Sequence, residues 1–79
     1  MGLMRGELRH AVAIVPADAG TFDSPAFVYV GGDGNVVAIP EGSAVAVTFV
    51  GMSAGDILPV LCTRVNSTST TATNLVAMW

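Results

Sequence analysis

Apolar residues occur along this chain in short runs that are rich in Val and Ile and divided by Gly, Pro, Asp and Ser. Runs of this length and composition are typical of β-strands. No stretch long enough to form a helix repeats its apolar residues with the helical period of about 3.6 residues. The pattern therefore predicts an all-β chain, with strands at residues 11–15, 26–30, 36–39, 44–50, 57–65 and 75–78.

The residues between these runs predict how the strands are connected. Pro16 ends the first strand because proline has no N–H for a ladder hydrogen bond. The Gly-rich segment 31–35 joins two strands and predicts a β-hairpin between them. Pro59 marks its strand as an edge strand or as the site of a bulge. Since Thr favours extended backbone, part of the polar segment 66–74 is expected to lengthen the flanking strands.

Short strands at this close spacing predict a small β-sandwich or a partly open barrel. We assign residues 11–79 to this single β-domain. Residues 1–10 contain Gly and carry Arg5, Glu7 and Arg9, and we assign them to an exposed N-terminal arm.

The composition predicts that the chain is stable only within an assembly. A chain of 79 residues buries a small core and usually needs a disulfide, a metal or a partner chain. Cys62 is the only cysteine and His10 the only histidine, so one chain can form neither a disulfide nor a zinc cluster. Charged residues make up 11% of the chain and hydrophobic residues 52%, with no lysine. Such a monomer would expose apolar patches, so we expect a homo-oligomer; the alternative is a monomer that is simply rich in Ala and Val.

Membrane insertion and nucleic-acid binding both fit the sequence poorly. No unbroken apolar run is longer than the one at residues 11–15, whereas a transmembrane helix needs about 20 residues. The N-terminus lacks the apolar run and cleavage site of a signal peptide, so we expect synthesis in the cytoplasm. The formal net charge is −3, and Arg5, Arg9 and Arg64 are too few to neutralise nucleic-acid phosphates.

The Gly-rich segment 31–35 has two functional interpretations, and we favour neither. A phosphate-binding loop needs a following helix N-terminus and usually a lysine, but a strand follows this segment. A calcium loop needs further oxygen ligands, and the side chains of residues 36–39 offer none. The glycines are then expected to supply the positive φ angles of a hairpin loop, and Asp33 to cap that turn through its own backbone.

The residues that could support catalysis do not form a recognisable active site. Cys62 lies in an apolar strand, and no third group is marked that would orient His10 as its base. The acidic residues are scattered over loops and the arm, at Glu7, Asp18, Asp23, Asp33, Glu41 and Asp56. No spacing marks two of them as an acid–base pair. We therefore expect no enzymatic activity, no cofactor and no metal site.

A series of short motifs lies between residue 26 and Trp79, in the order Tyr-Val-Gly-Gly, Val-Thr-Phe, Leu-Pro-Val, Arg-Val and a Thr-rich stretch. They occupy residues 29–32, 47–49, 58–60, 64–65 and 70–73. In this order the motifs resemble the spike-base family of small virion proteins, which occurs in tailed phages and gene transfer agents. The resemblance implies a structural subunit on the particle surface, a base that sits on the capsid or tail and carries a fibre or spike.

Together with this resemblance, the composition predicts a virion structural protein of a phage-like particle, either a spike base or a capsid-decorating (cement) subunit. Its expected partners are further copies of itself, capsid or tail proteins and, for a spike base, a fibre. The alternative is a carbohydrate- or receptor-binding β-module of a phage tail or spike. Tyr29 and Trp79 are the only Tyr and Trp available to stack on a sugar.

The interface residues expected from the sequence lie in the arm and at a few large or charged positions of the β-domain. They are Leu3, Met4, Arg5, Leu8, Arg9, Tyr29, Arg64 and Trp79. The arm has few apolar side chains to bury on its own subunit, so we expect it to order on a neighbour and attach the chain to the particle. Residues 75–79 are expected to form a strand of the core sheet.

Overall fold

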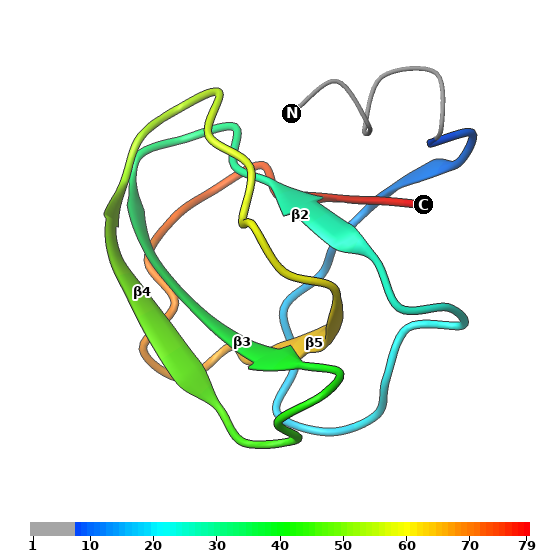
Figure 1. Cartoon of the computed structure of the whole chain (residues 1–79). Coiled ribbons are helices and arrows are strands. Elements are labelled where there is room, and N and C mark those ends of the chain that lie inside the picture. Colours follow the sequence, from blue (N-terminus) through cyan, green and yellow to red (C-terminus); the bar gives the residue numbers. More distant parts are fainter. Residues whose placement is uncertain (1–7) are drawn as a thin grey trace.

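The chain folds into two small antiparallel sheets, and the residues described contain no helix (Figure 1). The computed structural model describes residues 8–79. The strands are β1 (Ala11–Ala13), β2 (Phe27–Tyr29), β3 (Gly34–Pro40), β4 (Val47–Met52), β5 (Cys62–Val65) and β6 (Val76–Met78). One sheet has the order β1-β6-β2 and the other has the order β4-β3-β5. The all-β prediction is confirmed.

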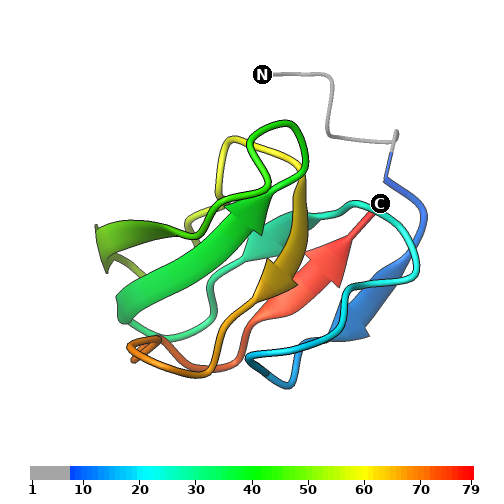
Figure 2. The same ribbon diagram turned by 90° about the horizontal axis from the view of Figure 1, so that it is seen from below.

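The first sheet brings the two ends of the described chain together. β6 is its middle strand, so that Val12 on β1 and Val28 on β2 both lie opposite Ala77. Figure 2 shows β6 (red) beside β1 (blue) near the C-terminus. The C-terminal strand is therefore part of the core sheet, as the sequence predicts.

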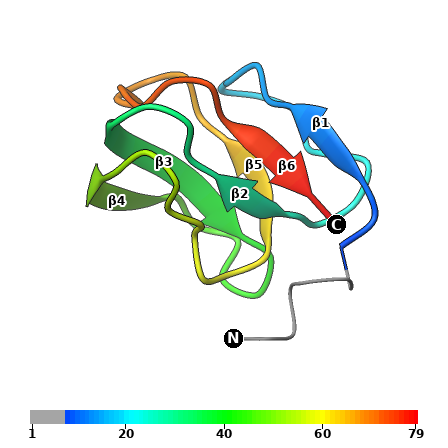
Figure 3. The same cartoon turned by 90° about the horizontal axis from the view of Figure 1, so that it is seen from above.

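Backbone hydrogen bonds from residues 26–28, at the start of β2, to residues 58–62, which lead into β5, join the two sheets. Ala26 and Cys62 exchange two such bonds, of 2.9 and 2.8 Å, and the Leu58 amide donates to the Val28 carbonyl at 2.9 Å. Within residues 8–79, β1 and β4 each pair with one strand only. β2 and β5 are edge strands of their own sheets as well, but the bridge between Ala26 and Cys62 joins these two sides, so β1 and β4 are left at opposite sides of the molecule (Figure 3).

The β-hairpin predicted between residues 26–30 and 36–39 is wrong. β2 pairs with β6, whereas β3 pairs with β4 and β5, so the chain crosses from one sheet to the other at its glycines. There Gly32 exchanges hydrogen bonds of 2.8 and 3.2 Å with Thr73, which extends the pairing as expected for part of segment 66–74. A Cβ atom on Gly32 would collide with the Thr73 side chain. The glycines are therefore needed because two backbone segments approach each other closely here. Gly34 also has a positive φ, of 151°, as predicted for this segment.

The bounds of all the strands differ from the predicted ones, and those of β4 and β5 differ most. β5 is short because the chain bends at Pro59, and Ile57 makes only an isolated bridge to Tyr29. β4 begins late and runs on through a bulge, where the Gly51 amide donates to the Asn35 Oδ1 at 2.9 Å. Asp33 does not cap its own turn as predicted, because its Oδ1 accepts a hydrogen bond of 2.8 Å from the Ala54 amide. The Asp33 carboxylate thus binds a turn from another part of the chain.

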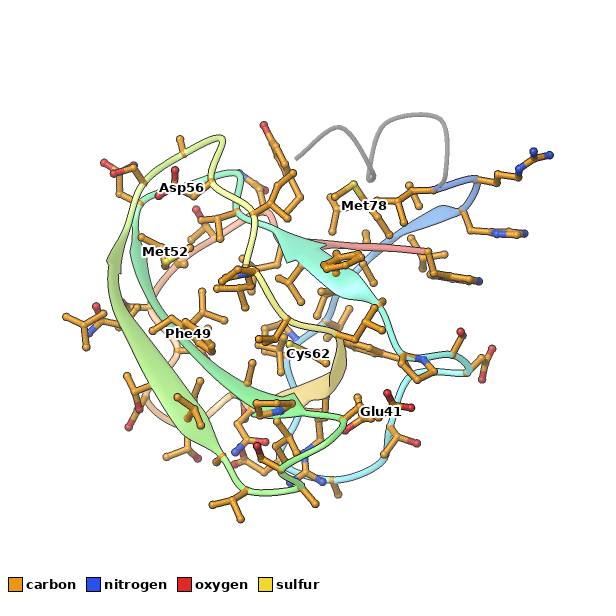
Figure 4. The ribbon with its side chains drawn as sticks, in the orientation of Figure 1. Glu41, Phe49, Met52, Asp56, Cys62 and Met78 are labelled. Carbon is orange, nitrogen blue, oxygen red and sulfur yellow. The ribbon has the colours of Figure 1, made fainter. Side chains whose placement is uncertain are left out.

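The core lies between the two sheets and consists of small and branched side chains. Its fully buried members include Val28, Val30, Val36, Ala38, Leu58, Cys62 and Val65. Phe49 and Met52 point from β4 towards this cluster, in whose middle Cys62 lies (Figure 4). No polar side chain of residues 8–79 is fully buried, so the side chains of this interior contribute by apolar packing.

Candidate functional site

The two ends of the described chain meet at one edge of the first sheet. The amides of Arg9 and His10 both donate to the Trp79 carbonyl at 2.7 Å, and the Trp79 amide donates to the His10 carbonyl at 3.0 Å. The His10 and Trp79 rings are stacked, with their centroids 5.1 Å apart and their planes inclined by 10°. The structure thus places the base of the predicted arm directly beside the C-terminal aromatic side chain.

The other predicted interface residues are dispersed over the β-domain. Tyr29 lies half-buried on β2, opposite Ile57. Arg64 lies on β5, where its Nε donates to Asn66 Oδ1 at 2.8 Å and its Nη1 donates to the Gly20 carbonyl at 3.4 Å. Those bonds hold a loop of the same chain. The structure therefore brings together Arg9 and Trp79, but it does not bring Tyr29 and Arg64 to the same place.

Three of the predicted arm residues, Leu3, Met4 and Arg5, lie outside the residues that the structure describes. Leu8 is the first described residue of the arm, and its side chain is half-buried. The interface assigned to the arm therefore stays a prediction.

An apolar groove of about 270 Å³ opens between β1 and the loop at residues 21–23. Its lining includes Ile14, Phe22, Ala77 and Trp79, and Asp23 supplies one carboxylate. Val12 and Val15 also line it and are largely exposed, at 54% and 87%. A groove of this kind can accept an apolar side chain from another molecule.

A second apolar surface lies on the opposite side of the molecule, on and just before β4. Val45, Val47 and Val50 are exposed there, at 66%, 41% and 74%. No charged residue lies between Glu41 and Asp56. Since one side of β4 is unpaired within residues 8–79, exposed valines coincide with a free strand edge.

The groups considered for catalysis lie apart. Cys62 is buried in the core, where burial raises the pKa of its thiol to about 11. A thiol with this pKa is protonated at neutral pH and is a poor nucleophile. His10 is stacked on Trp79 at the ends of the chain instead. Within residues 8–79 no three His, Cys, Asp or Glu side chains gather as metal ligands, and no helix has the length and apolarity to cross a membrane.

Comparison with solved structures finds a similar chain in the capsid of a native gene transfer agent particle, computed with C5 symmetry. The two chains share 32% sequence identity and superpose with a TM-score of 0.76. The match covers 91% of this chain and 83% of that chain. This chain belongs to the same family. No protein-family model and no curated protein matches the sequence.

Membership of this family makes the chain a virion structural protein of the phage-like type, which confirms that part of the functional prediction. The narrower assignment to a spike base stays a prediction. The homo-oligomer and the attached fibre also stay predictions.

The exposed valines were missed as candidate interface residues. In residues 44–50, apolar side chains occupy both alternating faces of the predicted strand, on one face Val45 and Val47 and on the other Val50. A strand at the surface with two apolar faces and no charge is a signal for contact with another chain. The groove carried no such signal, because β1 and the loop at residues 21–23 meet only in the folded chain.

Proposed function

We propose that this virion protein is a surface subunit of a phage-like particle, and specifically a spike base that rests on the capsid or tail and holds a fibre. The similarity to the gene transfer agent capsid chain carries the proposal, because it extends over 83% of that chain at 32% identity. The order of short motifs from residue 29 to residue 73 narrows it to a spike base. The low content of charged residues, 11%, supports a subunit that is largely covered by neighbours.

The proposed role is structural and includes no catalytic step. The only cysteine is buried with a raised pKa, and its side chain donates to the Val60 carbonyl at 3.5 Å. Attachment to the particle is assigned to the arm. Its base lies beside Trp79, so the arm and the C-terminal edge of the first sheet would face the same neighbour.

The test uses particles from a strain that lacks this chain, to which the purified protein is added back. Full-length protein should bind at a fixed copy number, measured by quantitative mass spectrometry and by density in electron cryomicroscopy. A variant without residues 2–7 should remain folded and fail to bind, whereas the control variant Leu61→Lys, changed at an exposed position of the β-domain, should bind normally. If the truncated protein binds at wild-type occupancy, the β-domain surface and not the arm makes the attachment.

The same particles separate a spike base from a decoration subunit. Particles without a spike base should keep stable heads and lose their fibres, with few copies of the chain needed for restoration. Particles without a decoration subunit should instead release their contents on mild heating and take up many copies. Absence of the chain from purified wild-type particles would refute both roles.

A further inference from the structure

Within residues 8–79, one edge of β4 is unpaired, and its backbone groups can be assigned from the neighbouring strand. The Val37 amide donates to Thr70 Oγ1 at 3.0 Å, and its carbonyl accepts from the Asn66 amide at 2.8 Å, both on the side away from β4. Backbone groups of successive strand residues point to alternate sides, so the residues on either side of Val37 bond to β4. Thr48 lies opposite Val37, and its N–H and C=O therefore point to the free side.

The outer edge of β1 can be assigned in the same way. His10 exchanges hydrogen bonds with Trp79, and the Ile14 amide donates to the Leu75 carbonyl at 2.9 Å. By alternation Val12 also bonds to β6, and Ala11 and Ala13 direct their N–H and C=O groups outwards. Within residues 8–79 no strand pairs with this side of β1.

The two free edges match in chemistry and differ in shape. No charged residue lies between His10 and Asp18 around β1, or between Glu41 and Asp56 around β4. Proteins usually protect a solvent-exposed strand edge with charge or proline, because an unprotected edge pairs with other chains. Pro16 follows β1, but neither β1 nor β4 contains a charged residue or a proline. β4 carries projecting valines, whereas β1 borders the apolar groove of about 270 Å³. One edge therefore offers side chains that the other edge can receive.

We propose that β4 of one copy adds to the outer edge of β1 of the next copy, with the exposed Val50 of β4 seated in the groove beside β1. The two edges lie at opposite sides of the molecule in Figures 2 and 3, so each copy can use both at once. Such a head-to-tail contact links successive copies, and it closes into a ring when the rotation between copies allows. The inference deepens the proposed function, since it supplies the contact between copies of the base.

Proline variants test the backbone part of this contact. Thr48→Pro and Ala13→Pro each remove an N–H that points to the free side, so neither should cost a ladder hydrogen bond within the chain. Each variant alone should be monomeric at micromolar concentration by sedimentation and native mass spectrometry. Mixed together they should form a dimer containing one chain of each and nothing larger, because only one intact pair of edges remains.

Other outcomes of the proline experiment would overturn the proposal. If Ala13→Pro assembles like the wild type while Thr48→Pro does not, β4 pairs with β4 of a second copy and β1 takes no part. If both variants assemble like the wild type, or if the wild type itself is a monomer, the edges are not the contact. The result for either variant is interpreted only if its circular dichroism spectrum shows the strand content of the wild type.

Side-chain variants supply a second measurement that does not depend on proline. Val50→Lys places a charge at a position that is 74% exposed, so the fold should persist while the dissociation constant of the oligomer rises at least about tenfold. The control is Leu61→Lys, 40% exposed and outside both edges, which should assemble normally. An unchanged oligomer with Val50→Lys would refute the seating of Val50 in the groove. These experiments need no particle, so their failure is separate from failure of the protein to bind particles.

Discussion

Asp18 is the side chain that holds the polar segment between β5 and β6. Its Oδ1 accepts from the Ser67 and Thr68 amides at 3.0 Å each, and its Oδ2 accepts from the Thr68 hydroxyl at 2.5 Å. The Thr68 hydroxyl, followed by the Thr68 amide, lowers the pKa of Asp18 below the usual 3.8. A surface carboxylate thus fixes two segments of the chain that are far apart in sequence.

Asp18→Asn should lower the melting temperature at neutral pH, because it removes the charge that strengthens these hydrogen bonds. The folded pKa is depressed, so the stabilisation is present above the usual value of 3.8 and is lost as the pH falls through the lower folded pKa. The difference between wild type and variant should therefore shrink in acid. Thermal melting across this range measures it, with Glu41→Gln, an exposed carboxylate elsewhere, as a control that follows the wild type. A constant difference at all pH values would contradict the assignment.

Cys62 is expected to contribute packing alone. Its folded pKa of about 11 exceeds the usual 9.0, so its thiolate fraction at neutral pH is about 100-fold lower than that of a free thiol. Alkylation of the native protein should be slow and should become fast on unfolding in denaturant. Above pH 9.0 the thiol of the unfolded chain loses its proton, whereas the thiol of the folded chain keeps it up to about pH 11. The free energy of unfolding of the wild type should therefore decline as the pH rises above 9.0.

Cys62→Ser should lower the free energy of unfolding by about 1–2 kcal/mol, because a buried hydroxyl replaces an apolar thiol. Particle assembly should persist, as measured by copy number on purified particles. A variant that folds but does not assemble would show that Cys62 has a role beyond packing.

At the scale of the elements, the crossing from β2 to β3 decides the architecture. A hairpin would leave these strands side by side, yet the chain passes from one sheet to the other and pairs with residues 71–73 on the way. The crossing is possible because its glycines let two backbones approach closely.

Gly34→Ala should destabilise the fold severely. Its φ of 151° is unfavourable for a residue with a Cβ, and that Cβ would collide with the Ala72 backbone. The positive φ alone costs about 1–3 kcal/mol, and the collision adds to it. Gly42→Ala is the matched control: nothing lies within 4 Å of its added Cβ, so the change should be neutral or stabilise by up to about 1 kcal/mol. Denaturant unfolding of both variants measures the difference, and equal midpoints would refute the close approach.

At the scale of the whole molecule, the first sheet depends on the last strand, β6. β6 is the middle strand, so both outer strands of that sheet depend on the last residues of the chain. The base of the arm depends on them as well, through its bonds to Trp79.

Deleting residues 75–79 should therefore leave an unfolded chain, whereas deleting residues 2–7 should leave the β-domain folded. The second deletion stops before Leu8 so that the bonds from Arg9 and His10 to Trp79 are kept. Circular dichroism and dispersion of amide signals in NMR spectra compare the two. A folded chain without residues 75–79 would mean that β1 and β2 hold their positions without β6.

The sequence by itself determined the class of fold, the six strands and the kind of protein. Strand length, Val and Ile content and turn residues depend on local physics, and low charge in a short chain depends on composition. The order of the short family motifs indicated a virion protein. Tertiary structure alone decided the strand pairing, the crossing at Gly32 and the role of Asp33, because each depends on a partner distant in sequence. It also placed the groove beside β1 and the free edge of β4 on opposite sides, which no local pattern encodes.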